Sequence, residues 1–137
     1  NIWTGDDLGN LCIWKVTSKG KPRLKQKRKI ANTIGCFFQC GSHVYVGTSG
    51  PILTFNLQGG ITKNCYIGHG SLVNSIIMHR SQMWSCSNDG SILVWDLSKK
   101  GPIIQLQQGV SARVFCLMSF NEKVFSGSFD KTISVWG

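Results

Sequence analysis

The chain has 137 residues, of which 42% are hydrophobic and 15% are charged, and its formal net charge is +9. These values are those of a globular domain. The sequence contains no run of 18 apolar residues, so it indicates no transmembrane helix, and no signal peptide is visible.

Short runs of alternating β-branched and aromatic residues predict strands, and no segment keeps helical apolar spacing over three turns. Turn residues separate these runs, and the pair Asp89-Gly90 is a strong hairpin signal. In chain order we expect fourteen strands, at residues 2–5, 11–16, 24–29, 34–39, 43–47, 52–57, 63–67, 73–79, 82–87, 92–97, 103–107, 113–120, 123–128 and 132–136.

Four segments repeat along the chain, each consisting of a turn, a short apolar strand and a closing aromatic residue. The closing aromatics are 40 or 41 residues apart, at Trp14, Phe55, Trp95 and Trp136. A second aromatic series keeps the same register, at Trp3, Tyr45, Trp84 and Phe125. A period of about 40 to 45 residues indicates one blade-like unit per repeat, and neighbouring units must stack to bury their apolar faces.

With these repeats, the chain resembles the WD40-repeat family of β-propellers. Trp95-Asp96 matches the WD dipeptide of that family, Gly68-His69 matches its GH dipeptide, and residues 126–136 are close to its most typical sequence. The resemblance implies an all-β propeller segment of four-stranded antiparallel blades, three nearly complete and one partial, in a ring that is not closed. We expect units at about residues 1–29, 30–67, 68–107 and 108–137. Both ends of the chain fall inside strand patterns, so we expect a longer parent protein that carries the remaining blades.

The resemblance also implies a structural hydrogen-bond tetrad in the third unit. His69 would contact the carboxylate of Asp89 and the hydroxyl of Ser85, and Ser85 would reach the indole N–H of Trp95. A catalytic His–Asp pair with Ser85 as nucleophile is the competing interpretation. We favour the structural one, because the family pattern already explains the spacing.

The other three units depart from this tetrad. Val110 occupies the position of the His in the last unit, and Leu8 that of the Asp in the first. In the second unit, Ser49 and Phe55 replace the Asp and the Trp. We therefore expect weaker fixing within these units, partly offset by packing.

By resemblance, residues that flank the turn Asp or lead into the innermost strand meet partner proteins. The candidates are Thr33, Leu72, Asn88, Arg113 and Phe129, with Asp7 and Thr48. Phe129 beside Arg113 predicts an anchor, because aromatic residues and Arg dominate interface energetics. The alternative is that Phe129 only packs over its own turn.

Positive charge is concentrated in one segment, since eight of the 15 Lys and Arg residues lie between Lys15 and Lys29. The predicted basic patch comprises Lys21, Arg23, Lys25, Lys27, Arg28 and Lys29. Strand alternation places Lys25, Lys27 and Lys29 on one side and Leu24, Gln26 and Arg28 on the other. The favoured interpretation is an edge strand whose charges deter edge-to-edge pairing. An anionic lipid or an acidic protein is the second, and nucleic acid is the least favoured, because the run has no aromatic residues for base stacking.

The six cysteines lack zinc-ligand spacing, and most of them fall in predicted strands. This pattern favours reduced, buried thiols, with a disulfide or metal role as the alternative. Reduced thiols predict an intracellular location, cytoplasmic in preference to nuclear. We expect no metal and no cofactor, because the sequence has no phosphate-binding loop and no paired carboxylates apart from Asp6-Asp7.

The sequence therefore predicts a non-catalytic platform for protein–protein interaction within a larger scaffold or signalling protein. Two alternatives stay open. One is a regulatory or targeting module attached to an enzyme domain outside this chain, such as a kinase, a ubiquitin ligase or an exchange factor. The other is an anionic-lipid-binding module that uses the basic run.

Overall fold

The computed structural model describes residues 1–107 and 112–137, which form fourteen strands in four antiparallel sheets. The first sheet contains β1 (Ile2–Gly5), β2 (Asn10–Val16) and β3 (Pro22–Lys29). The second contains β4 (Ile34–Cys40), β5 (His43–Thr48), β6 (Ile52–Asn56) and β7 (Ile61–Tyr66). The third contains β8 (Val73–His79), β9 (Gln82–Ser87), β10 (Ser91–Trp95) and β11 (Pro102–Gln107), and the fourth contains β12 (Val114–Phe120), β13 (Lys123–Ser128) and β14 (Ile133–Trp136).

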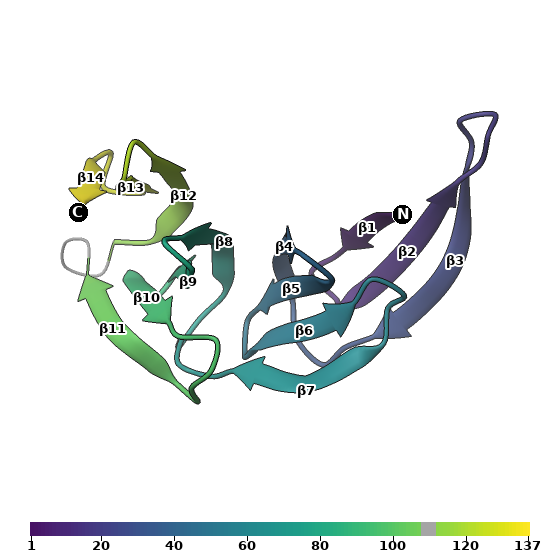
Figure 1. Cartoon of the computed structure of the whole chain (residues 1–137), viewed down its shortest axis with the longest axis horizontal. Coiled ribbons are helices and arrows are strands. Elements are labelled where there is room, and N and C mark those ends of the chain that lie inside the picture. The colour runs from purple at the N-terminus through teal and green to yellow at the C-terminus, as the bar shows by residue number, and fades with distance from the viewer. Residues whose placement is uncertain (108–111) are drawn as a thin grey trace.

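The sheets stand side by side in an arc (Figure 1). The inner strands β4, β8 and β12 contact one another along the arc, while β3, β7 and β11 lie on its outside. Each sheet runs from an inner to an outer strand by short hairpins, as in a propeller blade. The predicted all-β segment is confirmed, with strands grouped three, four, four and three and no closed ring over the described residues.

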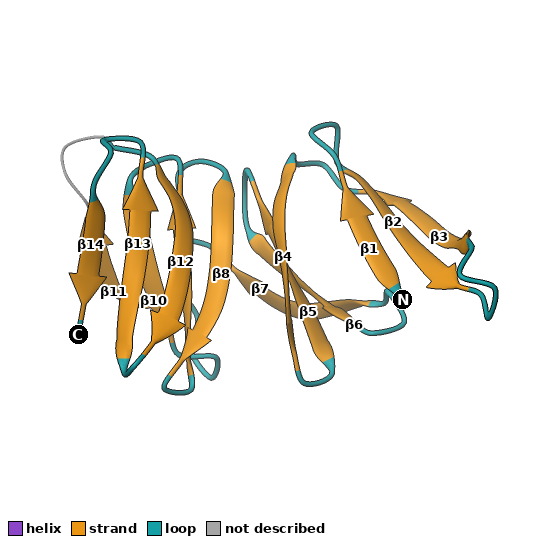
Figure 2. Cartoon of the chain, turned by 90° about the horizontal axis from the view of Figure 1, so that it is seen from above, coloured by secondary structure: helices purple, strands orange, loops and turns teal. Residues whose placement is uncertain are grey.

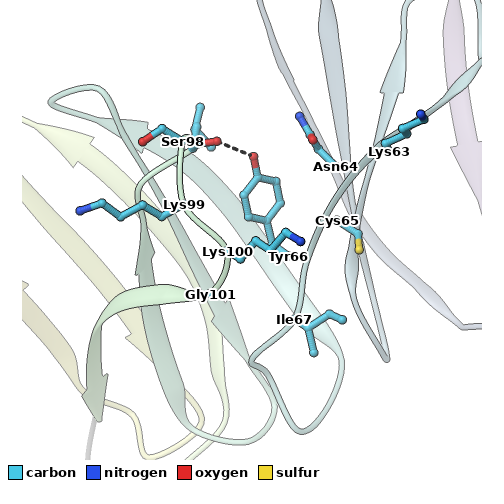
Figure 3. A pocket seen from close by; sticks show the side chains of 10 residues that line it. Lys63, Asn64, Cys65, Tyr66, Ile67, Ser98, Lys99, Lys100 and Gly101 are labelled. Carbon is cyan, nitrogen blue, oxygen red and sulfur yellow. Dashed lines mark hydrogen bonds between the residues drawn. The ribbon is translucent and has the colours of Figure 1, made fainter.

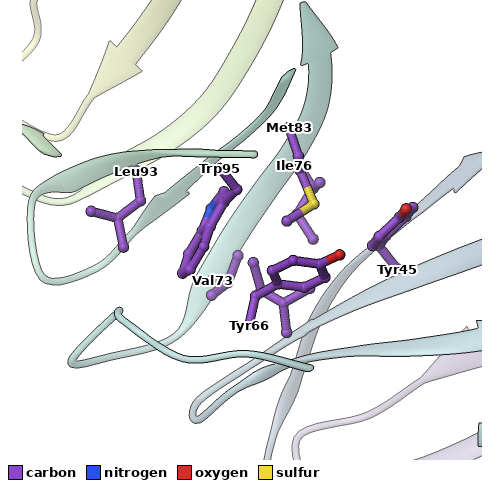
Figure 4. Packing of buried hydrophobic residues seen from close by; sticks show 8 residues of the cluster. Tyr45, Tyr66, Val73, Ile76, Met83, Leu93 and Trp95 are labelled. Atoms are coloured by element: carbon purple, nitrogen blue, oxygen red, sulfur yellow. The ribbon is translucent and has the colours of Figure 1, made fainter. Parts of the chain in front are cut away.

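Three apolar clusters fill the spaces between neighbouring sheets. Successive side chains of a strand point to opposite faces, so a sheet between two others contributes to two clusters. Figure 4 shows the middle cluster, where Tyr45 and Tyr66 of the second sheet meet Val73, Met83 and Trp95 of the third. The fold is therefore stabilised mainly by packing between sheets.

The outward face of the fourth sheet repeats a face that the third sheet buries. Ile92 and Val94 of the third sheet are 0% exposed beneath the fourth sheet. Ile133 and Val135 lie 41 residues further along the chain, at the same positions of the fourth sheet, and are 75% and 52% exposed. This face thus has the side chains of a sheet–sheet interface.

The inner hairpins turn through residues with positive φ. Arg80 and Ser81 join β8 to β9 at φ 48° and 62°, and Asn121 and Glu122 join β12 to β13 at φ 46° and 62°. Two successive positive φ values are the requirement of a type I′ hairpin turn, which matches the twist of the strands. The two turns are linked, since Arg80 Nε lies 2.9 Å from Glu122 Oε2.

Candidate functional site

A buried polar network crosses the third sheet. The Trp95 indole N–H donates to Ser85 Oγ at 2.8 Å, and Ser85 Oγ lies 2.7 Å from His69 Nε2. On the other side of the ring, His69 Nδ1 lies 2.8 Å from Ser91 Oγ, and the Ser91 hydroxyl donates to Asp89 Oδ1 at 2.6 Å. The direct distance from His69 Nδ1 to Asp89 Oδ2 is longer, at 3.5 Å.

The order of donors and acceptors in this network assigns the state of His69. Ser91 gives its proton to Asp89, so its oxygen is the acceptor for His69 Nδ1–H. Nε2 is then the acceptor for the Ser85 hydroxyl, whose oxygen receives the Trp95 N–H. Every member is satisfied by a neutral imidazole protonated on Nδ1.

Burial of His69 also favours its neutral form. Its side chain is 1% exposed, and desolvation lowers its pKa below the ordinary value of 6.5, although Asp89 opposes this shift. The pKa of Asp89 is also lowered, because hydrogen bonds from Ser91 and from the Gly70 N–H outweigh its own desolvation. Sequence reasoning missed Ser91, which bridges the His and the Asp.

The atoms of Ser85, His69 and Asp89 lie in the order of a hydrolase triad, but they cannot act as one. A nucleophilic serine must reach a substrate, with its oxygen free for attack. Ser85 is 0% exposed, and its oxygen already accepts the Trp95 N–H. Through His69, the network connects the β9–β10 turn, which holds Asp89, to Ser85 on β9.

Shorter versions of the network occur in the first and fourth sheets. The Trp136 indole donates to Ser126 Oγ at 2.9 Å, and the Trp14 indole donates to Thr4 Oγ1 at 3.0 Å. Val110, which was expected at the position of the missing His, lies outside the described residues. In the first sheet Asp6 fixes the turn, since its two carboxylate oxygens accept the backbone and side-chain N–H groups of Asn10, each at 2.7 Å.

The second sheet replaces the polar pair by an apolar one. Val46 occupies the position of Ser85 and Phe55 that of Trp95, and both are 0% exposed. The Phe55 ring makes an edge contact with Trp3 of the first sheet, at 5.8 Å between centroids. The turn is fixed by Thr48 instead, whose hydroxyl donates to the Pro51 carbonyl at 2.7 Å.

The partner-binding candidates occupy equivalent positions in three sheets. In each sheet, the residue after the second strand donates its backbone N–H to the carbonyl of the residue that leads into the innermost strand. These pairs are Ser49 with Thr33, Asn88 with Leu72, and Phe129 with Arg113, at 2.9–3.0 Å. The expectation for Thr48 was wrong, because this side chain is 0% exposed and turned into its own hairpin. Asp7 is exposed, and its carbonyl accepts the Thr33 hydroxyl at 2.8 Å.

Among these positions, the fourth sheet presents an exposed aromatic group. Phe129 is 68% exposed in the β13–β14 turn, and Phe115 at the start of β12 is 46% exposed. Figure 2 shows the β13–β14 turn at the end of the strands where β12 begins. Their rings meet edge to face at 6.3 Å, and the Arg113 guanidinium lies 6.0 Å from the Phe129 centroid. We call Arg113, Phe115 and Phe129 the aromatic edge.

The basic patch lies on β3, apart from Lys21 in the turn before it, and its side chains follow the predicted alternation only in part. Gln26 and Arg28 share the half-buried face toward the second sheet, and Lys27 and Lys29 lie on the opposite face. Leu24 was expected with Gln26 and Arg28, and this was wrong. The register shifts between Ile13 and Trp14, so that Lys25 is passed over and Leu24 joins the face of Lys27.

All six cysteines are free thiols, but they are not all buried. Cys86 is buried, and Cys36 is half-buried, with desolvation raising its pKa to about 12. Cys65 and Cys116 are exposed, contrary to the expectation that strand cysteines lie in the core. The described residues contain no cluster of three or more His, Cys, Asp or Glu side chains placed to hold a metal ion.

A cavity of about 440 Å³ lies between β7 and the β10–β11 turn (Figure 3). Three lysines line it, with Tyr66 and Ser98: Lys63, Lys99 and Lys100. Lys99 Nζ also lies 3.6 Å from Asp96 Oδ2. Sequence reasoning did not find this cavity, because its lining comes from two sheets.

Over the described residues, no helix is long and apolar enough to span a membrane.

Comparison with known proteins gives one family and several relatives. The family model described as "WD domain, G-beta repeat" matches residues 60–96 and 102–137. Zinc finger CCCH domain-containing protein 59 of Arabidopsis thaliana is 28% identical over 134 residues, which cover 93% of this chain and 27% of that protein. The putative E3 ubiquitin-protein ligase LIN-1 of Lotus japonicus is 40% identical over 65 residues, which cover 47% of this chain and 4% of that protein. The chain thus spans about a quarter or less of these two relatives.

Among solved structures, the computationally designed Ika4 protein is similar, with a TM-score of 0.77 and 20% identity. The match covers 98% of this chain and 82% of that one. At this identity the likeness concerns the fold alone.

Proposed function

Since this chain belongs to the WD domain, G-beta repeat family, we propose that it is a non-catalytic platform which binds other proteins through its aromatic edge. Repeats of this family serve in general as scaffolds for protein interaction, and the buried position of Ser85 supports a structural role for the His69 network.

The observation that carries this proposal is the exposure of Phe129 beside Arg113. An aromatic ring that is 68% exposed leaves most of its apolar surface in water, and burial against a partner would recover that free energy. Arg113 and Phe115 both contact the ring, and these contacts reduce the side-chain entropy that is lost on binding. Aromatic residues, Phe included, and Arg are enriched at protein interfaces relative to the rest of the surface.

Affinity capture from a cell extract, followed by quantitative mass spectrometry, tests the proposal. We expect Phe129→Ala to reduce capture of a defined set of proteins by about tenfold or more, as for a central interface residue. Phe120→Ala is the matched control, because Phe120 is 58% exposed on the same sheet but lies at the other end of β12. An equal loss for both variants, or no loss for either, would refute a role for the aromatic edge.

A module attached to an enzyme is the second candidate, and the relative named as a putative E3 ubiquitin-protein ligase favours it. In that case the catalytic residues would belong to another part of the parent protein, and this chain would still act by binding. The compartment stays a prediction, cytoplasmic in preference to nuclear, and rests on the six free thiols.

A further inference from the structure

The β2–β3 hairpin carries a concentration of positive charge that is not part of the aromatic edge. Residues 15–29, which we call the basic hairpin, contain eight Lys and Arg residues and no Asp or Glu. The hairpin lies at one end of the arc, and its tip reaches beyond the neighbouring strands (Figure 1). Its strands have seven and eight residues, whereas the corresponding β10 and β11 have five and six.

Most of these charges are free to meet a partner. Lys21, Arg23, Lys25 and Lys27 are exposed, and the ion pairs found among the described residues lie elsewhere. Two other members are already engaged. The Lys29 ammonium donates to the Leu8 carbonyl. Arg28 Nε donates at 2.7 Å to the Gln26 side-chain oxygen, in the amide orientation that satisfies both groups.

The other outer strands show that an outer position does not require this charge. β7 is the outer strand of the second sheet, and its one charged residue is Lys63, while β11 of the third sheet has none. All three outer strands have a register shift against their neighbour, and such irregularities already discourage edge-to-edge pairing. Edge protection therefore does not explain why β3 alone is basic.

We propose that the basic hairpin binds an acidic, extended segment of a partner protein along β3. The eight residues of β3 span about 26 Å at ~3.3 Å per residue, so the charges form a line and not a compact cluster. The outer edge of β3 pairs with no strand of the described chain, which leaves its backbone groups open to an extended segment. Acidic side chains on that segment would meet Lys27 and, across the register shift, Lys25.

Two other polyanions fit the hairpin less well. Single-stranded nucleic acid is held by base stacking on aromatic rings, and residues 15–29 contain none. Peripheral membrane binding gains strength from apolar side chains that enter the lipid, whereas the tip at residues 17–21 has no apolar side chain. This surface lies on the first sheet and the aromatic edge on the fourth, so each proposal can fail without the other.

Fluorescence anisotropy with a labelled peptide of alternating Glu and Thr tests the proposal on the full chain. The test variant combines Lys21→Gln, Arg23→Gln, Lys25→Gln and Lys27→Gln. The control combines Lys63→Gln, Lys100→Gln, Lys123→Gln and Lys131→Gln, which are also exposed and remove four charges from the same net charge of +9. Neither set includes Arg28 or Lys29, because their contacts within the sheet belong to the fold.

We expect the test variant to weaken peptide binding by about tenfold or more and the control by less than about threefold, because contact charges act more strongly than distant, screened ones. Hydrogen exchange should show added protection of β3 amides with the acidic peptide and none with a Gln-Thr peptide. Equal weakening by both variants would overturn the proposal, since net charge alone would then explain binding. It would also be overturned if phosphatidylserine vesicles or oligothymidylate bound to the hairpin while the acidic peptide did not.

Discussion

The second and third sheets each bury a large aromatic side chain at the same position, one without and one with a hydrogen bond to it. In the third sheet the buried Trp95 indole finds its acceptor in Ser85, and Ser85 in turn is held by His69. In the second sheet Phe55 and Val46 occupy the same two positions, with no polar atom on either side chain. Replacing both partners of a buried hydrogen bond is nearly neutral, whereas replacing one leaves the other unsatisfied. We therefore infer that these two positions of the repeat change together, as Ser85 with Trp95 or as Val46 with Phe55.

This comparison revises what the loss of the tetrad means. Phe55 in place of Trp was expected to weaken the second sheet, because a polar tie is lost. In the structure, Val46 and Phe55 leave no hydrogen-bonding group unsatisfied at these two positions, because neither side chain has a polar atom. Phe55 is also fully buried and contacts Trp3. The relative strength of the two sheets stays a prediction, which substitutions in the third sheet can test.

The largest effect should come from Ser85→Val, which introduces the valine of the second sheet but keeps the tryptophan of the third. The buried Trp95 N–H loses its acceptor and His69 Nε2 loses its donor, at about 1–3 kcal/mol for each unsatisfied group. We expect the free energy of unfolding to fall by about 2–6 kcal/mol, measured by chemical denaturation. Adding Trp95→Phe should recover part of this loss, because the orphaned N–H is then removed.

Ser85→Ala is the control for size, since it removes the hydroxyl without adding a methyl group. It should cost about as much as Ser85→Val if the unsatisfied groups dominate. If Trp95→Phe instead made Ser85→Val less stable still, the idea that the two positions vary as a pair would be wrong.

Much of this fold could be predicted from the sequence, because alternation and period are properties of single strands and single repeats. The expected strands lie within two residues of those observed, and the family is confirmed by the matched repeats. What failed depends on local geometry. The register shift that passes over Lys25 turned Leu24 to the other face. The bonds from Ser91 to Asp89 follow a local Asp-x-Ser/Thr pattern that recurs at Asp130 and Thr132, but that pattern does not show that His69 approaches Ser91 from another loop. The replacement of Ser85 by Val46 was visible in principle, since Val46 follows Tyr45 as Ser85 follows Trp84.

A smaller effect should appear as a pH dependence between about pH 5 and pH 7, which comes from His69 in the third sheet. Folding lowers the pKa of His69, so below its ordinary value of 6.5 the unfolded chain binds a proton that the folded chain resists. Stability is therefore complete above about pH 6.5 and falls as the pH decreases below it. The lowered pKa of Asp89 adds a further loss only below about pH 3.8. The apolar pair of the second sheet has no group that titrates.

Denaturation at about pH 7 and about pH 5 measures this dependence. His69→Gln should flatten it, because the group that takes up the proton is gone, while the exposed His43→Asn should keep the native slope. A chain that becomes more stable between pH 7 and pH 5 would contradict the assignment of a neutral His69.

The smallest effect concerns the inner turns, where the second sheet has Gly41-Ser42 and the third has Arg80-Ser81. Arg80→Gly makes the two turns alike. Glycine adopts φ 48° without strain, which should gain about 1 kcal/mol, but the ion pair with Glu122 is lost. That pair is 58% and 78% exposed, so we expect a cost of about 0.2–1 kcal/mol and a net change near zero. In a Glu122→Gln background the ion pair is absent, and the bond that Arg80→Gly still removes is the one from the Arg80 guanidinium to the backbone carbonyl of residue 122, at 3.4 Å. There Arg80→Gly should stabilise the chain by most of the conformational gain. Denaturation midpoints of the four proteins in this cycle separate the two terms, and equal shifts in both backgrounds would mean that the ion pair contributes nothing.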